Sequence, residues 1–414
     1  MLGKLNERYK EAIIIGAGFA GLLAAYRLLQ HGYRIKLFES RNRAGGLIDT
    51  VQTEQGLAES GAHTLRSSPA MDALFQELRI EPVVARTHKK YILRNGKFCR
   101  FPLTISETLG MAARAALVPA KMHYENLRDW ASHHLGAAAL ENLIHPMING
   151  IYAAGPAELS PKLIFPSLVP RPGETLLSCA LRQPRHPYKP SMIAPKGGMG
   201  ELTEALLRAV QSSGNSEIVF GETVAAMPDS PNMIITTPAP AAAQILQKEF
   251  PTSTKVLTNV RYAPLIAATV FLDKKSHRAP GGIGVLCGAN EPRRALGVLF
   301  NSSTFPHRVQ EEERIASYTV MLGGTSDPEI MNLSDAELEQ IIVSELHALF
   351  DLSAPPLQTV IHRWPHAIPI YSPHLAAAHQ ILRQDFCAKP GCILFGNYTG
   401  QISLRGMAQA FSAR

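Results

Sequence analysis

The sequence predicts an α/β fold in which strands from distant parts of the chain complete one parallel sheet. Three glycine-rich segments indicate this, at residues 16–21, 45–46 and 197–200. The first of them follows a short apolar run, Ala12 to Ile15, that suits a buried parallel strand. With 414 residues, 46% of them hydrophobic and 18% charged, the chain is long enough for two or three domains with ample cores.

The first glycine-rich segment has the G-x-G-x-x-G spacing of a dinucleotide-binding turn, with Gly16, Gly18 and Gly21. These glycines would give a tight turn, close approach of the backbone to a pyrophosphate, and close packing of a helix on a strand. That helix is expected over residues 22–31, with its N-terminal amides facing the phosphates. An ordinary glycine-rich turn is the alternative reading of the spacing alone.

A second strand and an acidic residue follow at the expected interval. Residues 34–38 suit a strand, and Glu39 ends it near the position of an acid that binds the ribose. Strand, turn, helix, strand and acid in this order predict a Rossmann-like domain that binds a dinucleotide. NADP is a poor candidate because the Glu39 carboxylate would repel its additional phosphate.

The residues after Glu39 indicate which dinucleotide binds. Arg43-Ala44-Gly45-Gly46 resembles the R-x-G-G extension of the flavin-linked amine oxidase superfamily, in which it makes further pyrophosphate and flavin contacts. The resemblance implies FAD as the cofactor. A basic surface turn is the alternative reading, and it is the expected role of Arg41.

Further segments match the same superfamily and extend the expected FAD site. Glu59, Gly61 and Ala62 match an E-x-G segment that passes beside the flavin ring, and a strand ending at Val224 would touch the adenine. The side chain of His63 is expected to face solvent or to be hydrogen-bonded within its loop. The residues expected to bind FAD are Gly16, Gly18, Phe19, Ala20, Gly21, Glu39, Ser40, Arg43, Gly45, Gly46, Leu47, Gly61, Ala62, His63, Val224, Gly396, Asn397, Ile402 and Ser403.

The order of these segments divides the chain into five parts. We expect a FAD-binding domain assembled from discontinuous segments, an α+β substrate domain, and a helical insertion that would face either the substrate or a membrane. The predicted parts are 1–88 (FAD-binding), 89–195 (helix-rich insertion, with a long proline-rich loop at 170–195), 196–260 (FAD-binding), 261–360 (antiparallel substrate sheet) and 361–414 (FAD-binding, closing).

Three segments narrow the resemblance to the oxygen-dependent protoporphyrinogen and coproporphyrinogen oxidases of haem biosynthesis. They are residues 150–166, 297–306 and 363–371. The resemblance implies a six-electron oxidation of a porphyrinogen in three hydride transfers to the flavin, with dioxygen as acceptor and hydrogen peroxide as product. It leaves open which porphyrinogen is the substrate. Lys90 matches a position where the family often has an arginine near the substrate; a surface lysine is the alternative reading.

Two other functions stay open at this stage. A flavin amine oxidase would need an aromatic cage, and Tyr398 is the one candidate wall, although a structural tyrosine is the preferred reading. A catalytically inactive FAD-binding homologue is the other. No Ser-His-Asp arrangement, zinc-ligand spacing or carboxylate pair can be argued from the sequence. No catalytic side chain and no metal site are therefore expected, and the flavin would carry the reaction.

Charge and cysteine usage set the expected partners and compartment. The net charge of +7 favours an anionic substrate or an anionic membrane surface, whereas nucleic acid is disfavoured because no Lys/Arg run occurs. Five widely spaced cysteines indicate reduced thiols in a cytoplasmic protein. The expected oligomeric state is a monomer or a homodimer, between which the sequence does not choose. Residues 105–122 form either an ordinary domain helix or an amphipathic helix resting on the inner face of a membrane.

Overall fold

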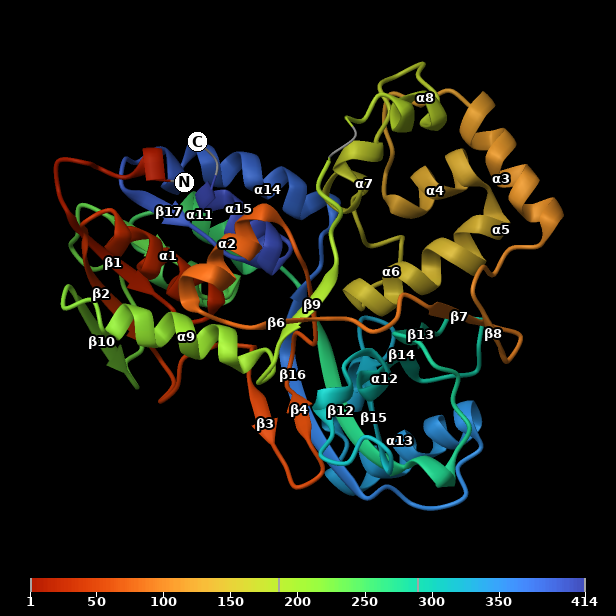
Figure 1. The fold of residues 1–414 in the computed structure, drawn as a ribbon. Coiled ribbons are helices and arrows are strands. Elements are labelled where there is room, and N and C mark those ends of the chain that lie inside the picture. Colours follow the sequence, from red (N-terminus) through yellow and green to blue (C-terminus); the bar gives the residue numbers. More distant parts are fainter. Residues whose placement is uncertain (1, 185–186, 289, 413–414) are drawn as a thin grey trace.

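The computed structural model describes residues 2–184, 187–288 and 290–412. Figure 1 shows three regions: an α/β region holding both chain termini, a second region built on a large sheet, and a helical region above that sheet. The chain passes between these regions several times, so the α/β region and the region of the large sheet are each built from separate segments. An α/β fold is therefore confirmed.

A five-stranded parallel sheet is the centre of the α/β region. Its strand order is β10-β2-β1-β11-β17, and all neighbouring pairs are parallel. The strands are β1 (Glu11–Ile15), β2 (Arg34–Glu39), β10 (Ser216–Phe220), β11 (Met233–Ile235) and β17 (Cys392–Leu394). The sheet therefore draws on both ends and the middle of the chain, as the sequence predicts.

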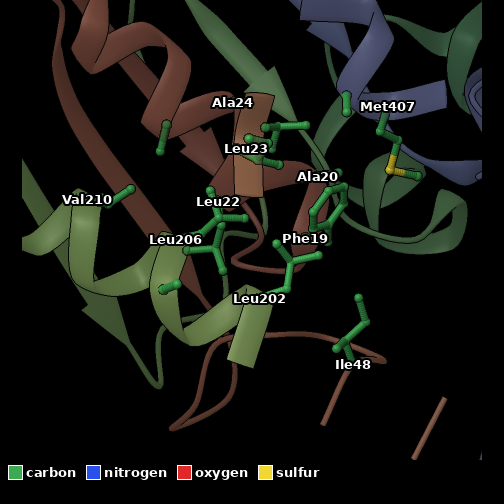
Figure 2. Packing of buried hydrophobic residues seen from close by; sticks show 14 of the residues in the cluster. Phe19, Ala20, Leu22, Leu23, Ala24, Ile48, Leu202, Leu206, Val210 and Met407 are labelled. Carbon is green, nitrogen blue, oxygen red and sulfur yellow. The ribbon is translucent and has the colours of Figure 1, made fainter. Parts of the chain in front are cut away.

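Helices cover both faces of this sheet. On one face, α1 (Phe19–Gln30) packs against α9 (Gly200–Gln211), and Figure 2 shows Leu22 beside Leu206 in this core. Also in this core is α15 (Leu404–Ser412), through Met407 and Ala408. The other face is covered by α10 (Ala239–Leu246), α11 (Pro251–Thr258) and α14 (Pro373–Gln384).

The second region is a seven-stranded sheet of order β16-β12-β15-β14-β13-β7-β8, antiparallel except for the pair β13 and β7. Its strands are β7 (Lys90–Arg94), β8 (Lys97–Cys99), β12 (Tyr262–Asp273), β13 (Gly284–Leu286), β14 (Ala295–Phe300), β15 (Ile315–Gly323) and β16 (Gln358–Pro369). Helix α13 (Asp335–Phe350) packs on one face and begins with a capping box formed by Ser334 and Glu337.

The helical region contains α3 (Ile105–Leu117), α4 (Leu127–Leu135), α5 (Ala137–Ala139), the π-helical turn η2 (Leu140–Ile144), α6 (His145–Tyr152), α7 (Pro161–Ile164), η3 (Pro166–Leu168) and α8 (Leu176–Leu181). Every described residue of α3 is at least partly exposed, so this helix lies at the surface and contacts α4, α5 and α8 along one side only. Among the described residues, no helix combines the length and apolar character that crossing a membrane requires.

The remaining described elements are short and lie within or between the three regions. They are η1 (Leu2–Lys4), the hairpin β3 (Thr50–Gln52) and β4 (Leu57–Glu59), the sheet of β5 (Leu65–Arg66), β9 (Met192–Pro195) and β6 (Pro82–Val84), with α2 (Pro69–Leu78), η4 (Lys274–Ser276), α12 (Asn301–Thr304), η5 (Pro306–Arg308), η6 (Pro328–Asn332), η7 (Phe386–Ala388) and η8 (Asn397–Thr399).

Several elements differ from the sequence-based expectation. Strand β16 crosses the predicted boundary at residue 360 because it pairs with β12 along its whole length. Strands β7 and β8 come from the part predicted to be helix-rich and join the large sheet, and the expected proline-rich loop contains α8 and β9. The division into five parts itself stays a prediction.

Candidate functional site

The carboxyl edge of the parallel sheet brings together most of the residues expected to bind FAD. Because its strands are parallel, the segments that follow them all emerge at the same edge, where open α/β sheets bind ligands. Gly16 follows β1, residues 40–47 follow β2, Thr236 and Thr237 follow β11, and Gly396 comes shortly after β17. Because β2, β1, β11 and β17 are neighbours in the sheet, these segments lie close together although they are far apart in the sequence.

The glycines of the first turn leave room for a pyrophosphate. Gly16 has φ of +102°, a left-handed conformation that favours glycine, and a Cβ on Gly21 would lie 1.8 Å from the Gly16 carbonyl oxygen. A Cβ on Gly18 would meet only the Gly46 Cα, at 3.8 Å. Helix α1 begins at Phe19, and the first amides of a helix have no acceptor within it. This combination fits a bound diphosphate.

The R-x-G-G turn lies directly against the first turn. The Gly45 amide donates to the Ala17 carbonyl at 2.8 Å. The Arg43 guanidinium donates to the carbonyls of Ala44 and Gly46, at 3.1 and 3.2 Å. Arg43 therefore stabilises the turn from within the chain and keeps Gly45 and Gly46 beside the first glycine-rich turn.

Glu39 is buried at the end of β2 and faces the glycine-rich turn. One carboxylate oxygen accepts from the Ala17 amide at 2.7 Å, and the other accepts from the Arg41 amide at 3.0 Å. Each carboxylate oxygen has a second lone pair. Glu39 is thus held in place by the backbone while retaining acceptor capacity for ribose hydroxyls.

A buried ion pair joins the E-x-G segment to η5, the short helix that precedes β15 of the large sheet. The side chains of Glu59 and Arg308 are each only 1% exposed, and Arg308 Nη2 lies 3.1 Å from Glu59 Oε1. Glu59 also accepts from the Thr50 hydroxyl at 2.6 Å and from the Met199 amide at 2.9 Å. Burial raises the pKa of Glu59, and the Arg308 charge opposes this shift. The carboxylate of Glu59 therefore ties together three distant parts of the chain.

The loop after Glu59 is held at two carbonyl groups. Arg308 Nη2 donates to the His63 carbonyl at 2.5 Å, and the Trp364 indole donates to the Ser60 carbonyl at 2.6 Å. A Cβ on Gly61 would lie 2.4 Å from the Leu47 carbonyl oxygen, so the loop also packs closely on the R-x-G-G turn. The arrangement places Gly61, Ala62 and Leu47 next to one another.

His63 does not have the environment that the sequence favoured. Its side chain is only 7% exposed, and neither ring nitrogen has a hydrogen-bond partner among the described residues. Burial, followed by the charges of Arg308 and His362, lowers the pKa of His63 to about 3. The expectation of a solvent-facing or hydrogen-bonded loop histidine is wrong, because long-range packing covers the loop.

The remaining residues predicted to bind FAD lie in the segments that follow β2, β10 and β17. Strand β10 ends at Phe220, so Val224 lies beyond the strand in the following irregular segment, and the expectation of a strand through Val224 is wrong. Ser40 is exposed at the end of β2, Asn397 opens η8, and Ile402 and Ser403 precede α15. Their contacts to FAD stay a prediction.

Lys90 and Tyr398 lie apart from the glycine-rich turns. Lys90 is exposed at the start of β7, in the large sheet rather than the parallel sheet, and no salt bridge to it occurs within the described ranges. Tyr398 is buried in the core beneath the parallel sheet, which supports the structural role favoured by the sequence. Its hydroxyl has no described hydrogen-bond partner.

The three segments that resemble the porphyrinogen oxidases meet in space. The Ser160 amide donates to the Tyr371 carbonyl at 2.7 Å, and the rings of Tyr152 and Tyr371 make an edge contact with centroids 5.7 Å apart. The side chain of Leu286 lies between residues 150–166 and 297–306: Cβ atoms built on Gly150 and Gly297 would lie 2.4 and 3.2 Å from it. Helix α6 and the residues after it thus contact two separate parts of the large-sheet region, at β13 and β14 and just beyond the end of β16.

Sequence reasoning missed several residues of this site. Thr237 and His362 each have a buried polar atom without a described hydrogen-bond partner, as does Arg308 at Nε. Thr236, next to Thr237, donates to the Gly16 carbonyl at 2.8 Å. The available signal for Thr237 was the Thr-Thr-Pro sequence that directly follows the apolar residues of β11. Across the described part of the chain, no group of His, Cys, Asp and Glu side chains could hold a metal ion.

Comparison with known proteins agrees with this geometry. The family model of flavin-containing amine oxidoreductases matches residues 19–413. Protoporphyrinogen oxidase 2 of Arabidopsis thaliana (chloroplastic/mitochondrial) is 24% identical over 465 residues, covering 95% of this chain and 91% of that protein. Coproporphyrinogen III oxidase of Bacillus subtilis is 23% identical over 451 residues, covering 95% of this chain and 94% of that protein.

Solved structures share the fold at lower identity. A protein from Exiguobacterium sp. 255-15, provisionally named a protoporphyrinogen oxidase, has a TM-score of 0.80 at 20% identity, covering 97% of this chain and 96% of its own. Reduced UDP-galactopyranose mutase has a TM-score of 0.76 at 14% identity, covering 97% and 93%. The expectation of a FAD-dependent oxidoreductase is confirmed by the family match, which spans most of the sequence: the chain belongs to the family of flavin-containing amine oxidoreductases.

Proposed function

We propose that this flavoprotein oxidises a porphyrinogen, either protoporphyrinogen IX or coproporphyrinogen III, to the corresponding porphyrin. The observation that carries the proposal is the contact between residues 150–166, 297–306 and 363–371, the segments that resemble the porphyrinogen oxidases. The named relatives support it, because their similarity extends over 95% of the chain.

The chain's own residues would bind and orient rather than transfer protons. When bound, FAD supplies hydride acceptance and reoxidation by dioxygen, so that one porphyrinogen and three dioxygen molecules give one porphyrin and three hydrogen peroxide molecules. Gly16, Gly18 and Gly45 would hold its diphosphate, Glu39 its ribose, and the loop from Gly61 to His63 its ring system. Lys90 would attract substrate propionates as a point charge.

An aerobic assay with purified protein tests the proposed function. Protoporphyrinogen, coproporphyrinogen and a panel of amines are incubated separately with the FAD-loaded protein. We expect porphyrin fluorescence to rise together with hydrogen peroxide, three molecules for each porphyrin formed. Bleaching of the flavin by an amine, or bound FAD without turnover of either porphyrinogen, would contradict the proposal.

We also propose that the helical region contacts an anionic membrane surface without crossing the membrane. Large apolar side chains project from it into solvent, with Ile105, Leu117 and Met122 exposed by 83%, 76% and 86%. The other exposed apolar residues of this region include Phe101, Leu109, Leu177 and Leu181. Exposed Arg100 and the net charge of +7 favour anionic lipid. Figure 1 shows α3 and α8 at the outer edge of the molecule, away from the parallel sheet.

The double variant Leu109→Glu, Leu117→Glu is expected to weaken vesicle binding at least about tenfold, since burial of one such side chain is worth about 1.5–3 kcal/mol. Binding is measured by flotation with vesicles containing phosphatidylserine and with vesicles of phosphatidylcholine alone. Leu357→Glu, at an apolar site 43% exposed on the large-sheet region, is the matched control and should bind as the unchanged protein does. Equal flotation of all variants, or dimer formation through α3 without vesicle binding, would contradict the membrane contact.

A further inference from the structure

We propose that the His63 imidazole is a direct hydrogen-bonding contact of the bound flavin and that Arg308 is the residue that positions it. The proposal rests on the FAD cofactor and not on the identity of the substrate. The proposed contact is made by a side chain rather than by the backbone of the E-x-G loop, and Arg308 comes from η5, far away in the sequence.

The first observation is that the His63 imidazole is buried without an internal partner. Its side chain is 7% exposed, yet neither Nδ1 nor Nε2 is hydrogen-bonded to any described residue. Buried polar groups in folded proteins are nearly always hydrogen-bonded, so such a ring calls for a partner from outside the chain. His362 is near enough to influence the His63 ring electrostatically, but its Nε2 atom is likewise without a described partner. The two imidazoles therefore do not satisfy each other.

The second observation is that the backbone around His63 is fixed. Arg308 holds the His63 carbonyl at 2.5 Å, and Trp364 holds the Ser60 carbonyl at 2.6 Å. Arg308 is itself held by Glu59, which is bonded to Thr50 and to the Met199 amide. The imidazole thus projects from a loop anchored by Arg308 of η5 and by Trp364 of β16, and the unpaired ring is a feature of a rigid arrangement. Preorganised groups of this kind lose little freedom when a ligand binds.

The third observation is that the surroundings of His63 keep its ring neutral. Burial and the positive charge of Arg308 both keep the His63 ring neutral at physiological pH. A neutral imidazole has one N–H donor and one acceptor nitrogen. The polar edge of an isoalloxazine ring offers both acceptors and a donor, so a neutral ring can pair with it in either tautomer. A protonated His63 ring would be repelled by the positive charge of Arg308.

The variant His63→Leu separates a flavin contact from a structural role, because the two predict opposite effects without FAD. If the His63 ring hydrogen-bonds only to the flavin, His63→Leu leaves the melting temperature of the apoprotein unchanged or raises it. The same substitution lowers the melting temperature of the FAD-loaded protein. We expect FAD affinity to fall about fivefold to hundredfold, the range for a lost hydrogen bond to a buried polar group. The visible spectrum and the midpoint potential of the bound flavin should shift as well.

Two further measurements make the test decisive. His134→Leu is the matched control: His134 is fully buried on α4 with Nδ1 unpaired among described residues, and its other ring nitrogen lies 2.6 Å from the Tyr124 hydroxyl. It should destabilise the apoprotein and the FAD-loaded protein alike and leave FAD affinity unchanged. In the unsubstituted protein, the 15N resonances of the His63 ring should move on addition of FAD. Unchanged resonances, or His63→Leu protein with unaltered FAD affinity and flavin spectrum, would overturn the proposal.

Discussion

Replacement of Gly21 by alanine is expected to lower FAD affinity by at least about hundredfold, so that the protein is purified without its yellow cofactor. The new Cβ would lie 1.8 Å from the Gly16 carbonyl oxygen, a backbone atom that cannot rotate away. Relief of this overlap requires the turn and helix α1 to separate, and the diphosphate position is formed by that turn. The measurement is the ratio of flavin to protein absorbance after purification, followed by FAD titration of the apoprotein.

Gly110→Ala is the matched control for this substitution. Gly110 lies inside α3, and no atom lies within 4 Å of a Cβ built on it. Alanine in an exposed helix interior is favoured over glycine by about 0.5–1 kcal/mol, so the control should bind FAD fully and be slightly more stable. A Gly21→Ala protein that retained FAD at the level of Gly110→Ala would show that the close packing of helix on strand is not required for cofactor binding.

Replacement of Arg308 by methionine is expected to lower the free energy of unfolding by about 3–5 kcal/mol, because it leaves the Glu59 carboxylate buried without its counter-charge. The substitution also removes the bond to the His63 carbonyl, so FAD binding should weaken together with stability. Thermal and chemical unfolding of the apoprotein give the first effect, and FAD titration gives the second.

The effect of this substitution should depend on pH. In Arg308→Met the pKa of the buried Glu59 rises further, and a carboxyl whose folded pKa exceeds its unfolded pKa loses stability as pH rises. The variant should therefore be less stable at pH 8 than at pH 5, relative to the unsubstituted protein. Arg86→Met is the control, since Arg86 pairs with Glu312 in an exposed ion pair worth about 0–1 kcal/mol. Equal destabilisation by the two substitutions would contradict the importance assigned to burial.

The parts of the site that could be predicted are those in which nearby residues determine the structure. The glycine spacing, the strands around it and the acid at Glu39 are local patterns, and all of them lie where the sequence indicated. The hairpin of β7 and β8 at Asn95-Gly96 and the capping box at Ser334 are local in the same sense. Their geometry depends on a few neighbouring backbone angles and hydrogen bonds, which composition and spacing reveal.

The parts that could not be predicted depend on contacts between distant residues. Arg308 and Glu59 are 249 positions apart, and nothing near either residue indicates the pair. The burial of His63 follows from Arg308, Trp364 and the large sheet, so its own loop sequence suggested the opposite environment. Strand β10 likewise ends before Val224 because its pairing with β2 ends there, between Phe220 and Glu39.

The strand order of the parallel sheet has a consequence for synthesis of the protein on the ribosome. Strand β11 pairs with β1 on one side and with β17 on the other, and β17 begins at Cys392 in a chain of 414 residues. The edge of β11 is therefore uncovered until residues 392–394 have been synthesised. Sheets with such non-local pairing fold slowly and expose edges that aggregate. The β11 edge that β17 covers is therefore the paired edge of the parallel sheet that stays exposed longest during synthesis.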